Sequence, residues 1–328
     1  MDIFGILSMI GGLALFLYGM EAMGAGLSKL SGGRMERLLE KLTSKRIMAV
    51  LLGAGVTAVI QSSSATTVMV VGFVNSGIMK LNQAVGIIMG ANIGTTITSW
   101  LLSLTGIQGS SFILKMLKPS SFSPILAIVG IIFIMFTKDE KKKDIGGIFL
   151  GFAILMYGME AMSGAVAPLA DNEKFTGILT MFSNPILGLL AGTILTAVIQ
   201  SSSASVGILQ ALCATGAVNF STALPIIMGQ NIGTCVTALL SAIGANKNAK
   251  RAAMIHLYFN LIGTVIFMAL FYLINTAVHF SFMTQMATPA TIAITHSIFN
   301  ITATVVWLPF SGCLLYTSPS PRDMRRSR

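Results

Sequence analysis

Residues 57–65 read Thr-Ala-Val-Ile-Gln-Ser-Ser-Ser-Ala, and residues 196–204 repeat them letter for letter. Each copy lies inside a long apolar stretch of the chain. A polar group left unpaired in hydrocarbon costs several kcal/mol, so a Gln and three serines at that depth require polar partners or a polar ligand. The two Gln-Ser-Ser-Ser motifs, at 61–64 and 200–203, therefore predict a two-fold polar site built inside a bilayer.

The composition is that of an all-α integral membrane protein. Hydrophobic residues make up 54% of the chain, charged residues only 10%, and the mean hydropathy is +0.82. A helix needs about 20 apolar residues to cross a bilayer. Segments near this length are predicted at 3–20, 84–104, 145–165, 222–243, 252–275 and 289–311, with a shorter one at 124–137. The net charge of +10 is carried by the connections, so we expect a lipid bilayer and no nucleic acid as partner.

The two ends of the chain call for separate interpretations. Only Asp2 precedes the first apolar segment, which we interpret as a retained helix and not a signal peptide. Residues 312–328 break from the apolar style and lack periodicity, and we interpret them as a tail outside the fold, from a truncated or read-through end. The cysteines have no metal-ligand spacing and are expected to be small buried apolar residues: Cys213, Cys235 and Cys313.

The duplication extends beyond the serine motif. Residues 18–23 return at 157–162, and the Asn-Ile-Gly-Thr block of 87–95 returns with one change at 226–234, each 139 residues further along. A constant offset indicates an internal structural repeat. Within a transport domain of 1–311, we expect repeat 1 at about 1–104, a linking helix at 124–137, repeat 2 at about 145–243, and additional helices at 252–275 and 289–311.

Each Gln-Ser-Ser-Ser segment is predicted to be a re-entrant helical hairpin. The apolar arms of the first copy, 47–60 and 65–79, reach roughly 22 Å each as helices, short of the roughly 30 Å hydrocarbon core. Two half-depth arms that meet at the serines fit better than one continuous helix. Broken helices at membrane depth are tolerated where they line a cavity inside the protein.

The basic residues favour the same topology. With the N-terminus outside, most of them fall in the cytoplasmic connections 28–46, 138–144 and 244–251, as the positive-inside rule requires. The outer connections hold Lys115, Lys118 and Lys174, the last beside Asp171 and Glu173. One extra span near 124–137 reverses the second repeat. The chain is therefore predicted to be an inverted-repeat transporter, with one hairpin entering from each side.

The hairpin tips suit an anion and a hard cation together. A helix that restarts at the serines presents free N–H groups and a partial positive charge, to which the hydroxyls add donors. Side-chain amide and hydroxyl oxygens suit Na⁺. The candidate anion ligands are Ser62, Ser63, Ser64, Ser201, Ser202 and Ser203, and the candidate sodium ligands are Gln61, Gln200, Asn92, Thr95, Thr96, Asn231 and Thr234.

Three further observations concern ionisable groups. His256 and His296 recur in two similar His-x-x-Phe-Asn segments, as structural hydrogen-bonding groups or as part of an ion pathway. Glu21 and Glu160 are expected at helix ends, at the membrane interface. No His, Lys or Asp neighbours either serine triplet, which argues against an intramembrane serine hydrolase, so no enzyme activity is expected.

The chain resembles the type II sodium/phosphate cotransporter family, in particular its bacterial members. The residues that carry the resemblance are the motifs at 61–64 and 200–203, the paired Asn-Ile-Gly-Thr blocks and the late His-x-x-Phe-Asn segments, over about 1–311. The resemblance implies inorganic phosphate and Na⁺ at the hairpin tips, with Thr95 and Thr234 in the sodium shell. It also implies a C-terminal regulatory domain, which we expect to be missing here.

The resemblance also makes two differences between the copies notable. The second copy has Ser205 where the first has Thr66, and Cys235 where the first has Thr96, and either change would alter sodium affinity or number. The function expected is sodium-coupled phosphate symport by alternating access, with Na⁺ as coupling ion and no other cofactor. The alternatives left open are a phosphate exporter, a transporter of another oxyanion and an anion channel.

Overall fold

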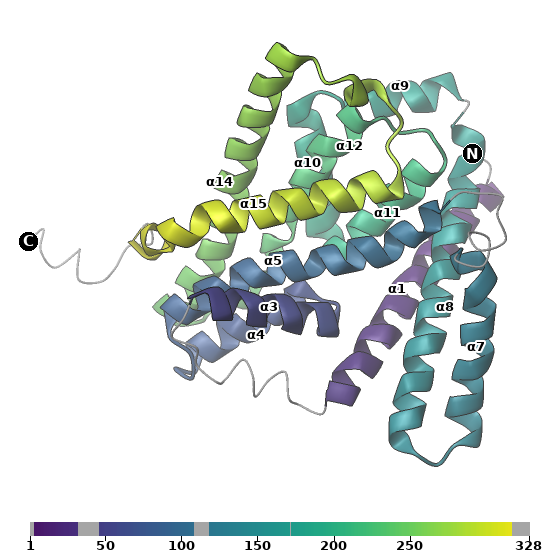
Figure 1. Ribbon diagram of the computed structural model, residues 1–328, viewed down its shortest axis with the longest axis horizontal. Coiled ribbons are helices and arrows are strands. Elements are labelled where there is room, and N and C mark those ends of the chain that lie inside the picture. Colours follow the sequence, from purple (N-terminus) through teal and green to yellow (C-terminus); the bar gives the residue numbers. More distant parts are fainter. Residues whose placement is uncertain (1–2, 32–45, 108–117, 171, 317–328) are drawn as a thin grey trace, which may run out of the picture.

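The computed structural model describes residues 3–31, 46–107, 118–170 and 172–316. Within these ranges the chain is a bundle of helices (Figure 1) joined by short connections, and an isolated bridge pairs Asn219 with Met286. The helices are α1 (Ile3–Ser31), α3 (Arg46–Ile60), α4 (Ser63–Asn75), α5 (Leu81–Ser103), α7 (Pro119–Phe136), α8 (Glu140–Val166), α9 (Glu173–Met181), α10 (Pro185–Ile199), α11 (Ser202–Ala214), α12 (Phe220–Gly233), α13 (Cys235–Ser241), α14 (Lys247–Val278) and α15 (Pro289–Tyr316).

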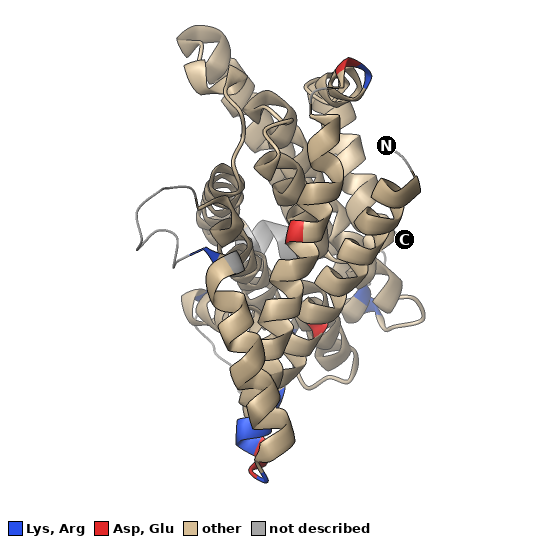
Figure 2. Ribbon diagram, turned by 90° about the vertical axis from the view of Figure 1, so that its right-hand side faces the viewer, with Lys and Arg blue, Asp and Glu red and all other residues tan. Residues whose placement is uncertain are grey.

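The described residues confirm a multi-pass membrane protein. Six of their helices are long and apolar enough to span a bilayer, and they coincide with the six longer segments predicted from the sequence. Helices α9 and α10 form a pair sharply bent by 97°, as in a broken span or a re-entrant loop, and α7 is a shorter apolar helix. Large apolar side chains such as Val198 and Val265 are exposed, as a lipid-facing surface requires. Most charged residues lie at helix ends and connections (Figure 2).

Helices α1 and α8 show that the two repeats are inverted. They are equivalent by the 139-residue offset, yet they pack antiparallel, with Gly12 against Gly158 and Gly19 against Gly151. A methyl group on Gly19 would stand 2.6 Å from the carbonyl oxygen of Gly151, and one on Gly158 would stand 2.6 Å from that of Gly12. Gly151 is the counterpart of Gly12, and Gly158 is the counterpart of Gly19. Exchange of the two repeats therefore turns the Gly12–Gly158 contact into the Gly19–Gly151 contact. The repeats are related by a pseudo-two-fold axis between these helices.

Both hairpins are re-entrant, as predicted. Helices α3 and α5 run parallel, because Ala49 packs on Gly86 and, further along both helices, Thr57 packs on Gly94. Helix α5 therefore begins beside the start of α3, and α4 must carry the chain back between them. The second repeat packs α10 on α12 in the same parallel manner. With 15 residues, α3 and α10 are each shorter than the roughly 20 residues that a span requires.

The two hairpins return to opposite faces of the molecule. Asn75, at the end of α4, accepts a hydrogen bond on its side chain from the backbone N–H of Asn246, just before α14 (2.8 Å). The connection after α11 instead pairs with the segment that follows the other end of α14, since Phe220 N–H donates to the Gln285 carbonyl (2.9 Å). Because α14 is long enough to span the membrane, connections at its two ends lie on opposite membrane faces, and so do the open ends of the two hairpins.

This topology predicts the faces from which single cysteines react. Ser76→Cys and Lys141→Cys should react with an impermeant thiol reagent from one side of the membrane, and Ala214→Cys and Lys174→Cys from the other. The measurement compares right-side-out and inverted vesicles of a variant without native cysteines. Reaction of Ser76→Cys and Ala214→Cys from the same side would exclude the inverted arrangement.

Several sequence-based boundaries and placements were wrong. Helix α15 continues through Pro309 to Tyr316, so the expected tail boundary at 312 falls inside a helix. Glu21 and Glu160 lie within α1 and α8 and not at helix ends, because α1 continues past the apolar segment at 3–20 to Ser31 and Glu160 stands six residues before the end of α8. Some predicted features lie outside the described residues: Arg34, Arg37, Lys41, Lys45, Lys115, Asp171 and residues 317–328.

Candidate functional site

Each hairpin turns at its glutamine. Gln61 and Gln200 have φ angles of 59° and 58°, in the left-handed region that residues other than glycine rarely adopt. The serine that follows each glutamine caps the next helix, because Ser62 Oγ accepts from Ala65 N–H (3.1 Å) and Ser201 Oγ from Ala204 N–H (3.2 Å). The Gln-Ser sequence thus ends one arm and starts the other within two residues.

The arms of each hairpin are also tied together below the turn. Thr57 Oγ1 donates to Thr66 Oγ1 at 3.0 Å in the first hairpin. Thr196 Oγ1 donates to Ser205 Oγ at 2.8 Å in the second. The replacement of Thr66 by Ser205 therefore keeps the hydroxyl that closes the hairpin. Both ties are buried, so each hairpin is held as one unit.

The two tips meet at the first residues of α4 and α11. Ser63 Oγ and Ser202 Oγ lie 3.4 Å apart, and these two residues are copies of each other, 139 positions apart. Ser64 Oγ donates to the backbone carbonyl of Gln200 at 3.3 Å, which joins the hairpins a second time. The side chains of Ser63 and Ser202 are only 4% and 6% exposed. Two helix N-termini, each with a partial positive charge, therefore converge at one buried point.

A cavity of about 540 Å³ reaches these tips. Its lining comes from both hairpins, with Gln61, Ser62 and Ser201 among the residues, and from the C-terminal half of α1, which contributes Glu21. Among the lining residues that the structure describes there is no Lys or Arg. The groups that the described residues would offer to an anion at the tips are helix N-termini and hydroxyl groups.

The neighbouring helices contribute buried polar groups that bond to their own backbones. Asn92, Thr95 and Thr96 donate to carbonyl oxygens within α5, and Thr234 donates to Gln230 in α12. Within the described residues, none of these four forms a hydrogen bond with a hairpin tip. Their predicted place in a sodium shell stays a prediction.

A second polar cluster joins α12 to α15. Asn231 Oδ1 lies 3.2 Å from His296 Nε2 and accepts from Asn300 Nδ2 at 3.3 Å. The structure therefore brings together two predicted residues, Asn231 and His296, that the sequence assigned to different roles. His256 is fully buried on α14, and neither of its ring nitrogens has a partner among the described residues.

Sequence reasoning missed the residue that holds the first tip. Thr98 Oγ1, on α5, donates to Gln61 Oε1 at 2.8 Å. Thr98 lies three residues beyond the repeated block at 87–95, and its counterpart at the same offset is Thr237. A longer comparison of the two copies would have found this recurring threonine.

The comparisons with known proteins agree with the duplicated architecture. A model of the Na⁺/Pi-cotransporter family matches the chain twice, over residues 15–164 and 154–295, so each match contains one hairpin. No solved structure matches the chain.

Three relatives are informative. YjbB of Escherichia coli (strain K12), whose name gives inorganic phosphate export as a provisional assignment, is 28% identical over 308 residues, or 93% of this chain and 53% of YjbB. The chain thus spans about half the length of that relative. The uncharacterized protein YqeW of Bacillus subtilis (strain 168) is 28% identical over 303 residues, 92% of each chain. The sodium-dependent phosphate transport protein 2A of Rattus norvegicus is 36% identical over 123 residues, 36% of this chain and 18% of that protein.

Proposed function

The chain belongs to the Na⁺/Pi-cotransporter family, and on this premise we propose that it is a sodium-coupled symporter of inorganic phosphate that works by alternating access. The family is one of transporters and not of enzymes. The observation that carries the proposal is the convergence of two helix N-termini at Ser63 and Ser202, beside a cavity whose described lining residues include no basic side chain.

Phosphate would bind between the tips. The free N–H groups at the starts of α4 and α11 and the hydroxyls of the two serine triplets are donors, and phosphate oxygens are acceptors. The hydroxyls of Ser63, Ser202 and Ser203 are buried, so they act where water screens them least. Each hairpin would contribute half of the site, which is why the motif occurs twice.

Sodium would supply a positive charge at this point, where the described lining residues include no basic side chain. Opposite unit charges about 5 Å apart attract by roughly 3 kcal/mol at an effective dielectric constant of about 20. Each ion would therefore raise the affinity for the other, which is the thermodynamic basis of coupled transport. The neutral oxygens of Gln61 and Gln200 are candidate ligands, in keeping with the preference of Na⁺ for such oxygens.

Export of phosphate is an alternative to import as the direction of transport in the cell. The relative YjbB is named for phosphate export, and a carrier with an inverted repeat can run either way, as its gradients dictate. We place the protein in the bacterial inner membrane with its N-terminus outside, following the distribution of Lys and Arg. In that orientation the cavity along α1 opens toward the cytoplasm.

Flux into proteoliposomes tests the proposal. Radiolabelled phosphate should accumulate above its external concentration when an inward sodium gradient is applied, and the uptake should saturate. Potassium and proton gradients of equal size are the controls, and sulfate and arsenate are the competitors. Uptake that is equal in sodium and potassium would exclude sodium coupling, and single-channel currents would indicate a channel. Competition by sulfate stronger than by unlabelled phosphate would assign a different oxyanion.

A further inference from the structure

The two hairpin glutamines have the same backbone conformation but different surroundings. Gln61 is 6% exposed, and its side-chain oxygen accepts from Thr98. Gln200 is exposed, and its side chain has no hydrogen-bond partner within the part of the chain that the structure describes. Thr237, the counterpart of Thr98, has a buried hydroxyl that is likewise unpartnered among those residues. The hydrogen bond between Gln61 and Thr98 is formed in the first repeat, whereas Gln200 and Thr237 do not form the equivalent bond in the second.

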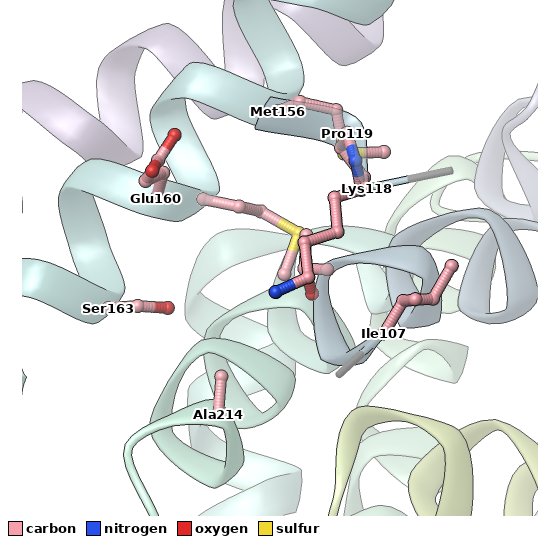
Figure 3. A pocket seen from close by; sticks show the side chains of 9 residues that line it. Ile107, Lys118, Pro119, Met156, Glu160, Ser163 and Ala214 are labelled. Carbon is pink, nitrogen blue, oxygen red and sulfur yellow. The ribbon is translucent and has the colours of Figure 1, made fainter. Parts of the chain in front are cut away.

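The two cavities show the same asymmetry. The cavity along α1 reaches the tips, as described above. A second cavity, of about 470 Å³, lies along α8 and is lined by Met156, Met159 and Glu160, the copies of Leu17, Met20 and Glu21 in the first (Figure 3). Its lining contains no residue of either Gln-Ser-Ser-Ser motif. The two cavities therefore lie along equivalent faces of α1 and α8, but only the first reaches the tips, and the second also contains Lys118.

The hairpins themselves are alike in this state. The Thr57–Thr66 and Thr196–Ser205 ties are both formed. The repeats therefore differ in how the hairpin is attached to its neighbouring helix and not in how the hairpin is closed. A buried hydroxyl without a partner is unfavourable, so the free Thr237 favours any state that pairs it.

We propose that Thr98 and Thr237 are alternating anchors of the two hairpins, and that the opposite-facing state forms Gln200–Thr237 while it releases Gln61–Thr98. In an inverted repeat, the two halves can exchange conformations and so give a state that faces the other side. In that state the cavity along α8 opens to the tips and the cavity along α1 closes. The inference rests on alternating access, as proposed above, and it assigns Thr98 and Thr237 as positioning residues.

Two equivalent alanines report the state directly. Ala65 is exposed and lines the cavity along α1, whereas its counterpart Ala204 is fully buried. In a variant whose native cysteines are replaced by alanine, Ala65→Cys should react readily with an impermeant maleimide and Ala204→Cys slowly. The rates are measured in detergent, without phosphate or sodium, so that both faces are accessible.

Removal of each anchor should move these rates in opposite directions. Thr98→Val should speed the reaction of Ala204→Cys by about fivefold to tenfold, because loss of one buried hydrogen bond raises the population of the opposite-facing state by that factor, and it should slow the reaction of Ala65→Cys. Thr237→Val should leave the first rate high and slow the second further. Thr98→Ser and Thr237→Ser keep the hydroxyl and should match the parent. If Thr98→Val does not fold, Gln61→Leu removes the same hydrogen bond and should give the same shift.

The outcomes separate the inference from the proposed function. Shifts in the same direction, or no shift with either valine variant, would overturn the assignment of the anchors even if the parent transports phosphate. Opposite shifts in a protein that shows no sodium-driven phosphate uptake would support the anchors and assign them a different cargo.

Discussion

Replacement of both Ser63 and Ser202 by alanine should reduce sodium-driven phosphate uptake by roughly 100-fold or more. Each substitution removes a hydroxyl from the convergence point, and a hydrogen bond to a charged group is worth about 1.5–3 kcal/mol. The two losses together account for the expected factor. The fold should survive, because the two hydroxyls lie against each other and the double variant leaves neither without its partner. The measurement is the initial rate of phosphate uptake into proteoliposomes.

Ser76→Ala is the matched control. Ser76 follows α4, is exposed, and donates to the carbonyl of Phe73, far from the tips in the same hairpin. Its uptake should equal that of the parent. If the folded Ser63→Ala/Ser202→Ala double variant takes up phosphate like the parent, the hairpin tips are not part of the phosphate-binding site.

Gly90→Ala should destabilise the folded protein severely. Gly90 lies where α5 crosses α3, and an added Cβ would stand 2.0 Å from the carbonyl oxygen of Val50. That atom belongs to helix backbone, which cannot rotate away as a side chain can, so the helices must separate. Overpacking of this kind costs about 1–3 kcal/mol, and backbone contact places it at the upper end. We expect the Tm in detergent to fall by on the order of 5–10 °C.

Gly55→Ala controls for the change of residue type. Gly55 lies on α3, and no atom stands within 4 Å of its added Cβ. Alanine favours helix over glycine by about 0.5–1 kcal/mol, so this variant should unfold at the parent temperature or above. Equal Tm values for the Gly90 and Gly55 variants would show that α3 and α5 do not approach as closely as described. The second repeat offers the same test at Gly229, whose Cβ would lie 2.0 Å from Leu189 oxygen.

The fold could be predicted because the sequence contains an internal repeat. The recurrence of residues 57–65 at 196–204 identified the repeat, and the short arms beside each motif identified the hairpins. Helix ends were harder, since hydropathy marks only the part of a helix that is apolar. Helix α8 begins at Glu140, ahead of the apolar segment expected from 145, because Asp139 caps it by accepting from the backbone N–H of Lys141.

The residues of the site could be predicted from the sequence, but their burial and their hydrogen bonds could not. The motif named the tip residues, and the structure places Ser63 beside Ser202. Their ligands remain predictions. The contact of Gln61 with Thr98 joins positions 37 apart and depends on which face α5 presents, which periodicity does not decide in so apolar a helix. Nor could identical motifs reveal that Gln61 is buried while Gln200 is exposed.

The glycine contacts between α1 and α8 have a consequence for the origin of the molecule. Gly12 meets Gly158 and Gly19 meets Gly151, so each half of the chain carries both surfaces of the junction that joins it to the other. A half-length ancestor inserted into the membrane in both orientations would have found these same surfaces on a second copy of itself. Fusion of two such genes would then have fixed an antiparallel dimer in a single polypeptide, and each half became free to diverge.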